Sequence, residues 1–361
     1  MTERGVPQTA ERIDNKQKWK YLLIVGGVLL LTVFIFSRSP MLSEGYMRTV
    51  YPVIATVFSF ISGIFPFSLY DLFIVAALLW FTGKILFVIL RKIPVNAFLF
   101  ALVRFIVIVV AWFYFGWGVA YFRDDFYTRN EVREVPFDKE NLRNVAIRFI
   151  GNANLFYGAS HDMNKEDVRE ELEHSYLRLQ RTLSLPYPNG KRRVKAMIFE
   201  SFYTKMGVSG YFGPFFNEIH VNNYGLPFTY PFTLAHEMAH QYGIAPESEA
   251  SLYAFIICAS SSDPVVRYSA YVSVLGYLLR DARRLLPDDY ESLISAIRPE
   301  IIADLQRNSE HWMAARNETL SDTQDKMYDV YLKTNQISSG RDNYSEVVGL
   351  LVSSYNVFLE K

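Results

Sequence analysis

Three long apolar runs in the first third of the chain constrain its fold more than any other feature. They cover residues 21–36, 68–90 and 98–121. A hydrocarbon core about 30 Å thick needs roughly 17–25 helical residues. Backbone N–H and C=O groups have no water partners in lipid, so each run must pair them internally, as a helix does. The sequence therefore predicts about three transmembrane helices within a membrane region at residues 21–122.

The first run is short for a span. It needs help from Trp19 and from the lysines before it, whose long side chains can reach the interface. A cleaved signal peptide is the alternative. Residues 37–39, Ser-Arg-Ser, form a poor cleavage site, and Pro40 follows directly. We therefore expect a retained anchor.

Basic residues predict the orientation of these helices. Five of them lie in residues 1–20, a polar stretch expected to be a disordered cytoplasmic tail, and Arg91 and Lys92 lie between the last two runs. The connection after the first run holds only Arg38 and Arg48. By the positive-inside rule, the chain is a multi-pass protein of the inner (cytoplasmic) membrane, with everything after the third span extracytoplasmic.

This orientation depends on residues 50–67. The stretch is apolar but is interrupted by Pro52, Gly63 and Pro66. It can be an interfacial or re-entrant helix, or a short span. If it spans the bilayer, the rest of the chain becomes cytoplasmic.

Composition changes at Arg123 to that of a soluble protein, so residues 123–361 are expected to form one domain. Helical patterns dominate it, with weak strand patterns at 194–199 and 215–221, and the predicted fold class is α+β with a small sheet. The 361 residues carry 37 basic and 37 acidic side chains, so no nucleic-acid partner is expected. The single cysteine, Cys258, lies in an apolar run and is expected to be buried.

The stretch Thr233–Gly243 contains the motif HExxH, with His236, Glu237 and His240. Residues four apart lie on one face of a helix, so both imidazoles can bind one zinc ion at about 2.0–2.1 Å. Glu237 can take a proton from a water that zinc activates. The neighbouring residues are apolar and predict a buried helix, in which these polar groups are costly unless something satisfies them. The alternative is two surface histidines on an amphipathic helix.

A catalytic zinc usually has three protein ligands and an open position. Glu247 and Glu249 follow the motif directly. They point in different directions on a helix, so one is expected to bind the metal and the other to orient a ligand imidazole. The spacing of Glu247 to Ala250 resembles the ExxA/S stretch that carries the glutamate ligand of gluzincin-type peptidases, which favours Glu247. Thermolysin-like enzymes place this glutamate much further downstream.

The whole pattern resembles a bacterial membrane family known as domain of unknown function 3810. Its members have a few N-terminal spans, an HExxHxxG helix followed closely by ExE-A, and a helical C-terminal part. The matching text here covers residues 236–250, together with Tyr328–Lys333 and Tyr344–Val348. The family supplies no established activity. HExxH implies a zincin-like, mostly helical domain.

In zinc peptidases with an HExxH helix, the strand before that helix commonly pairs with the substrate backbone. By this resemblance, residues 215–222 are expected to be an exposed edge strand, with Asn217, Ile219 and His220 binding substrate. His220 can also stabilise an oxyanion, although an ordinary strand histidine is the simpler interpretation. Further candidates for that role are Tyr224, Tyr230 and Tyr242.

These observations lead to two hypotheses. The first is a membrane-anchored zinc metallopeptidase (Zn²⁺ cofactor) that hydrolyses peptide bonds of a peptide or protein substrate outside the cytoplasmic membrane. The second is a non-catalytic zinc-binding envelope sensor or scaffold protein. The intact HExxH favours the first, because a scaffold that only keeps the metal has no need for Glu237.

Overall fold

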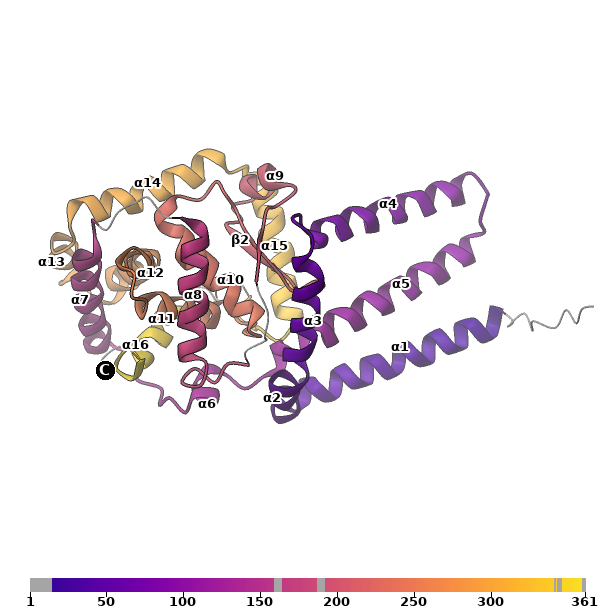
Figure 1. The fold of residues 1–361 in the computed structure, drawn as a ribbon, viewed down its shortest axis with the longest axis horizontal. Helices are drawn as coiled ribbons and strands as arrows, with labels where there is room; N and C mark the ends of the chain where they lie inside the picture. Colours follow the sequence, from indigo (N-terminus) through magenta and orange to yellow (C-terminus); the bar gives the residue numbers. More distant parts are fainter. Residues whose placement is uncertain (1–14, 159–163, 187–191, 341, 343–345, 359–361) are drawn as a thin grey trace, which may run out of the picture.

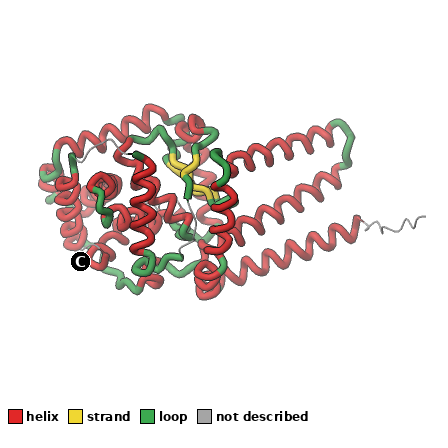
Figure 2. Tube along the Cα trace, in the orientation of Figure 1, coloured by secondary structure: helices red, strands yellow, loops and turns green. Residues whose placement is uncertain are grey.

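The computed structural model describes residues 15–158, 164–186, 192–340, 342 and 346–358. Figure 2 shows that helices dominate the molecule and that the strands form one small sheet. The expectation of a mostly helical chain with a small sheet is thus confirmed.

Three helices project from one side of the globular part (Figure 1). They are α1 (Asn15–Arg38), α4 (Leu69–Ile89) and α5 (Val95–Gly116). With 24, 21 and 22 residues they extend about 32–36 Å, enough to cross a bilayer. Almost none of their apolar surface is buried within the protein, as expected for helices that face lipid.

The ends of these helices differ from the prediction in two places. Helix α1 begins at Asn15, so residues 15–20 are helical rather than part of a disordered tail, and residues 1–14 lie outside the described chain. Helix α5 ends at Gly116, and the 3-10 helix η1 (Gly118–Phe122) turns back into the globular part. A Cβ on Gly118 would lie 2.6 Å from the Phe113 ring, so the sharp turn depends on glycine.

Two short helices, α2 (Pro40–Thr49) and α3 (Tyr51–Gly63), connect the first and second long helices. Helix α3 has 13 residues, or about 20 Å, which is too short to cross a bilayer. It crosses the ends of the long helices at their junction with the globular part (Figure 1). All three long helices therefore meet the globular part at the same end.

The sheet lies at this junction and links the long helices to the globular part. Its strands β1 (Val194–Lys195), β2 (Gly210–Gly213) and β3 (Glu218–Val221) are ordered β1-β3-β2. Strand β3 pairs with β1 in parallel and with β2 antiparallel. The buried Lys195 ammonium donates to Ser62 O in the last turn of α3 and to Phe65 O just after it. The Glu218 carboxylate accepts from the first two N–H groups of α4. The end of α3 and the start of α4 thus gain hydrogen-bond partners for backbone groups that have none within the helix.

Helix α11 (Glu247–Ala259) is buried on all sides, including Cys258 as expected. The other helices of the globular part are α6 (Phe126–Asn130), α7 (Lys139–Phe156), α8 (Lys165–Leu179), α9 (Glu200–Lys205), η2 (Pro227–Thr229), α10 (Tyr230–Gln241), α12 (Pro264–Leu285), α13 (Tyr290–Ser295), α14 (Pro299–Ala315), α15 (Glu318–Thr334) and α16 (Val347–Phe358). Helix α10 carries HExxH and packs against β2, β3 and α11.

Candidate metal centre

Helix α10 begins and ends where its sequence requires. Pro231 occupies its first turn, where a missing N–H costs nothing, and the helix ends before Gly243. Gly243 has φ of +81°, and a Cβ there would lie 2.6 Å from Met47 Cε on α2. Only glycine meets both conditions, so the chain can turn at once into α11 and bring Glu247 back to α10.

His236, His240 and Glu247 form a buried cluster that could hold a metal ion. The His236 Nε2–Glu247 Oε2 distance is 3.0 Å, His240 Nε2–Glu247 Oε2 is 3.4 Å, and the two Nε2 atoms are 3.2 Å apart. Ligand atoms about 2.0–2.1 Å from one tetrahedral zinc are about 3.3 Å from each other. The three donor atoms therefore already have the spacing of three corners of a zinc tetrahedron.

Hydrogen bonds behind the cluster orient its donor atoms. His240 Nδ1 lies 2.7 Å from Ile244 O, so Nδ1 carries the proton in the neutral ring and the Nε2 lone pair faces the cluster. His236 Nδ1 lies 3.2 Å from Ser251 Oγ. The Tyr328 hydroxyl donates to Glu247 Oε1 and leaves Oε2 beside the imidazoles. Such outer contacts are what a metal site needs to hold its ligands in place.

The three side chains of this cluster shift one another's pKa values. Burial lowers the pKa of His236. Burial also lowers the pKa of His240, but the Glu247 carboxylate outweighs it and raises that pKa to about 9. Burial raises the pKa of Glu247, and the two histidines outweigh it and hold the pKa well below the ordinary value. Glu247 is therefore charged at neutral pH and attracts a positive partner, which is the requirement for a metal ligand.

Glu237 belongs to the same helix but lies outside the cluster of three, and it lines the adjacent cleft. Burial raises the pKa of Glu237 to about 8. Strand β2 passes directly over it, because a Cβ on Gly210 would be only 2.7 Å from Glu237 Oε1. A carboxylate in this position can exchange a proton with a group in the cleft without binding the metal.

The two glutamates that the sequence offers as the third ligand have separate partners. Glu247 lies beside both imidazoles, as described above. Glu249 forms a buried salt bridge with Arg129 and accepts from Phe126 N, both on α6. The structure thus brings Glu247 and not Glu249 to the HExxH histidines, and Glu249 makes no contact with them that would orient either ring.

The expectation of an edge strand at residues 215–222 is wrong. Strand β3 is the central strand, because the two residues of β1 pair with one side of it and β2 with the other. Asn217, Ile219 and His220 are buried and lie outside the cleft. Asn217 bonds Tyr51 and Ser59 on α3, and His220 Nε2 lies 2.8 Å from Ser68 Oγ before α4. Asn217 and His220 link α3 and the start of α4 to the sheet, and β2 is one of the two edge strands.

The cleft beside the cluster has a volume of about 860 Å³. Residues of α4, α5 and η1 line one wall, β2 and the segment before it line another, and α15 lines a third. Tyr328 and Tyr331 of α15 face this space, whereas Tyr224, Tyr230 and Tyr242 do not line it. One feature of the sequence points to the wall formed by α15: Tyr328 and Tyr331 are three residues apart, so they lie on the same face of a helix.

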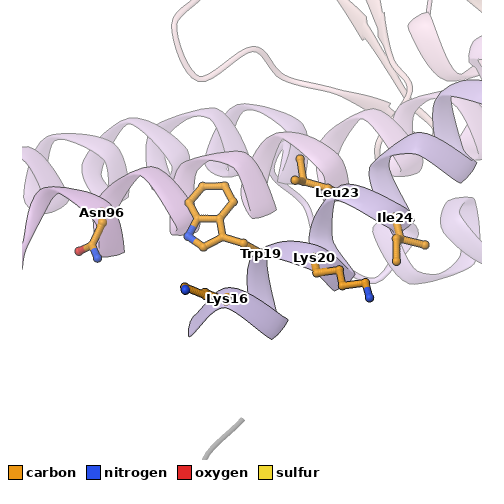
Figure 3. Close-up of a pocket in the computed structure, with 6 residues that line it drawn as sticks. All are labelled: Lys16, Trp19, Lys20, Leu23, Ile24 and Asn96. Carbon is orange, nitrogen blue, oxygen red and sulfur yellow. The ribbon is translucent and has the colours of Figure 1, made fainter. Parts of the chain in front are cut away.

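A separate hollow of about 650 Å³ lies beside α1 and α5, at the ends of these helices that point away from the globular part (Figure 3). Lys16, Trp19 and Lys20 are among the residues that line it, and the Trp19 ring lies 5.2 Å from the Phe100 ring between centroids. Tryptophan and lysine are typical of a membrane–water interface. These residues lie at the ends of the long helices away from the globular part (Figure 1) and contribute nothing to the cluster.

A family model described as "Protein of unknown function (DUF3810)" matches residues 46–352. The chain belongs to this family. The match includes α3, two of the three long helices, the HExxH helix and Tyr328, and it leaves α1 outside. No curated protein and no solved structure matches the chain. Its function therefore has to be argued from the site itself.

Proposed function

We propose that this protein is a membrane-anchored, zinc-dependent peptidase with a zincin-like site. The observation that carries the proposal is the cluster of His236, His240 and Glu247, whose donor atoms lie 3.0–3.4 Å apart beside Glu237 and a cleft. Two imidazoles and one carboxylate are a donor set that suits zinc and leaves a fourth position open.

Zinc held here would supply a Lewis acid and lower the pKa of a water molecule to about 7. Glu237 would accept the proton from that water during attack on a carbonyl carbon and deliver it to the leaving amine. His236 and His240 keep their Nε2 atoms aimed at the cluster through Ser251 and the carbonyl of Ile244. Burial of the cluster strengthens each of these electrostatic contacts.

Strand β2 supports a peptide as the substrate. It is one of the two edge strands of the sheet, residues 207–212 line the cleft, and Gly210 lies against Glu237. An extended peptide can pair with such an edge through its main chain, which holds a peptide bond close to the proposed base whatever the side chains are. The absence of a Cβ at Gly210 is what lets strand β2 itself lie this close to Glu237.

The positive-inside rule supports an extracytoplasmic cleft. The basic residues Lys16, Lys18 and Lys20 of α1 and Arg91 and Lys92 after α4 lie at the same end of the three long helices, away from the globular part (Figure 1). A topology reporter fused after Lys361 should be active only outside the cytoplasmic membrane. A reporter active in the cytoplasm would reverse the proposed orientation.

Zinc content and chelator-sensitive hydrolysis test the proposal together. The full-length protein in detergent is expected to bind one zinc per chain and to cleave members of a degenerate peptide library, with activity lost on chelation and restored by zinc. His236→Ala should abolish both. A protein that binds zinc tightly but cleaves no peptide would favour the sensor or scaffold instead, and a folded protein that binds no zinc would refute both.

A further inference from the structure

The proposed catalytic cleft lies directly at the end of a membrane helix. Helix α5 ends at Gly116, and the next residue, Trp117, donates its indole N–H to His240 O at 2.7 Å. The Trp117 and His240 rings are 6.2 Å apart between centroids. A zinc ligand of the proposed site thus contacts the first residue beyond a span.

The wall of the cleft continues into the spans themselves. Tyr70 and Ile74 come from the first two turns of α4, and Phe113 comes from the last turn of α5. Ile74 lies five residues from the start of its helix, so the cleft reaches about 8 Å along the span. Helices of 21 and 22 residues are about as long as the hydrocarbon core is thick, which puts these turns at the bilayer surface.

Helix α3 gives a second, independent indication of where the bilayer surface lies. Its polar face, with Ser59 and Ser62, is buried against the globular part, while its apolar face is exposed. The exposed apolar residues of α3 and its end are Val53, Val57, Phe60, Ile61 and Ile64. An amphipathic helix with this arrangement lies in the interface, with the apolar face toward lipid. Because α3 crosses the ends of the long helices, the bilayer surface runs along it (Figure 1).

Aromatic and apolar residues line the end of the cleft that meets the spans. The end at the spans is lined by Tyr70, Ile74, Phe113 and Trp117. At the other end, a second cavity of about 490 Å³ shares Ser209 and Thr233 with the first. Its lining mixes the polar residues Asn164, Lys165, Asn222 and Asn223 with the apolar residues Val221, Pro227 and Tyr230. A bound chain would therefore have an aromatic and apolar environment on the membrane side of the cluster.

We propose that the substrate is a membrane-anchored polypeptide, cut in the segment next to its own anchor. This inference rests on the proposed peptidase activity. In the reaction, the peptide C–N bond breaks, water oxygen bonds to the carbonyl carbon, and the amine takes up the proton. The products are an anchored stub and a released fragment. The contact between Trp117 and His240 puts the cluster within about 10 Å of the bilayer surface, and an extended chain covers that distance in about three residues.

The test uses full-length, zinc-loaded protein in phosphatidylethanolamine–phosphatidylglycerol vesicles. The probe is a degenerate peptide library about 25 residues long, which extends to roughly 85 Å, either free or carrying a palmitoyl anchor at one end. Cut positions are mapped by mass spectrometry. Bonds within about ten residues of the anchor should be cut at least tenfold faster than bonds near the free end of the same peptides. A soluble, broad-specificity peptidase on identical vesicles controls for the accessibility of each bond.

Each outcome separates this inference from the proposed function. Cuts spread evenly along the anchored peptides, or equal rates for the free library, would overturn the membrane-proximal substrate while the peptidase activity stands. Fatty acid released from the vesicle lipids without peptide cleavage would overturn it in favour of a lipid substrate. A zinc-loaded protein that cuts neither library would refute the peptidase and this inference together.

A second measurement needs no activity. Phe60→Cys on α3 is labelled with an environment-sensitive fluorophore, and the single native cysteine, Cys258, is buried. Lipid-borne quenchers should quench the label at residue 60. The matched control is Ser292→Cys on α13, an exposed position at the far side of the globular part (Figure 1). Equal quenching at both positions, or none at residue 60, would show that the cleft does not lie at the bilayer surface.

Discussion

Exchanging Glu247 and Glu249 separately for glutamine should have opposite effects on metal binding and on stability. Glu247→Gln removes the charged donor that lies 3.0 and 3.4 Å from the two imidazole Nε2 atoms. Losing a partner behind a metal ligand already costs about 10–100-fold in affinity, so losing the ligand itself should cost more than about 100-fold. The fold should survive, because Tyr328 and the two histidines can still bond the glutamine amide.

Glu249→Gln leaves the Arg129 guanidinium buried without its counter-charge. The side chains are 2% and 8% exposed, and breaking such a pair costs about 3–5 kcal/mol. At about 2–4 °C per kcal/mol for a domain of 150–250 residues, the melting temperature should fall by roughly 10 °C. Zinc should nevertheless bind with the affinity of the wild type at a temperature where the variant is folded.

The assay is zinc competition against a chromophoric chelator, run beside thermal unfolding of the detergent-solubilised full chain. The reasoning would be refuted if Glu249→Gln lost zinc and Glu247→Gln kept it. Equal, large losses of stability in both variants would show that Glu247 is part of the fold rather than a ligand.

Three further substitutions test other parts of the account. Tyr328→Phe removes the hydroxyl that donates to Glu247 and should weaken zinc binding by about 10–100-fold with little change in melting temperature; unchanged affinity would contradict its role. Gly243→Ala should destabilise the protein by at least about 1–2 kcal/mol, because φ is +81° and the new Cβ meets Met47. The control is Gly276→Ala in the middle of α12, where a Cβ would meet no other atom; it should stabilise the protein by up to about 1 kcal/mol. Burial lowers the pKa of His220 to about 4, so the unfolded chain binds more protons between pH 6.5 and 4. The wild type should therefore lose up to about 3 kcal/mol of stability as pH falls through that range, and His220→Gln should lack this loss in a pH series of unfolding curves.

The features that the sequence predicted are those that depend on local spacing. The spans follow from the length of uninterrupted apolar residues, because lipid leaves the backbone only one way to pair. The facing of His236 and His240 follows from the helical period alone. Glu247 could be proposed because Gly243 and Pro246 limit the connection between α10 and α11 to a few residues.

The features that the sequence did not predict depend on contacts between distant segments. Strand β3 is not the edge strand that the sequence predicted, because the two-residue strand β1 pairs with its other side. A strand of two residues is too short to show an alternating pattern in the sequence. Glu249 is satisfied by Arg129, 120 residues earlier, and Glu247 by Tyr328, 81 residues later. No period or motif records such pairings, because only packing brings the segments together.

The proposed position of the cleft at the membrane could not be predicted from the sequence either. Residues 50–67 left three alternatives open. Helix α3 buries its small polar residues against the globular part and exposes its large apolar ones, which supports the interfacial alternative. The sequence predicted that the third span ends at residue 121, so it did not predict the turn at Gly116. That turn is what puts Trp117 against His240.

The most direct test of the central claim is a comparison of Glu237→Gln with the wild type at equal zinc content. Glu237 lines the cleft but is not a ligand, so the variant should bind one zinc per chain with wild-type affinity. Loss of the base should lower the rate of peptide hydrolysis by about 10²–10⁴-fold. A variant that hydrolyses peptides at the wild-type rate, or one that no longer binds zinc, would contradict the account.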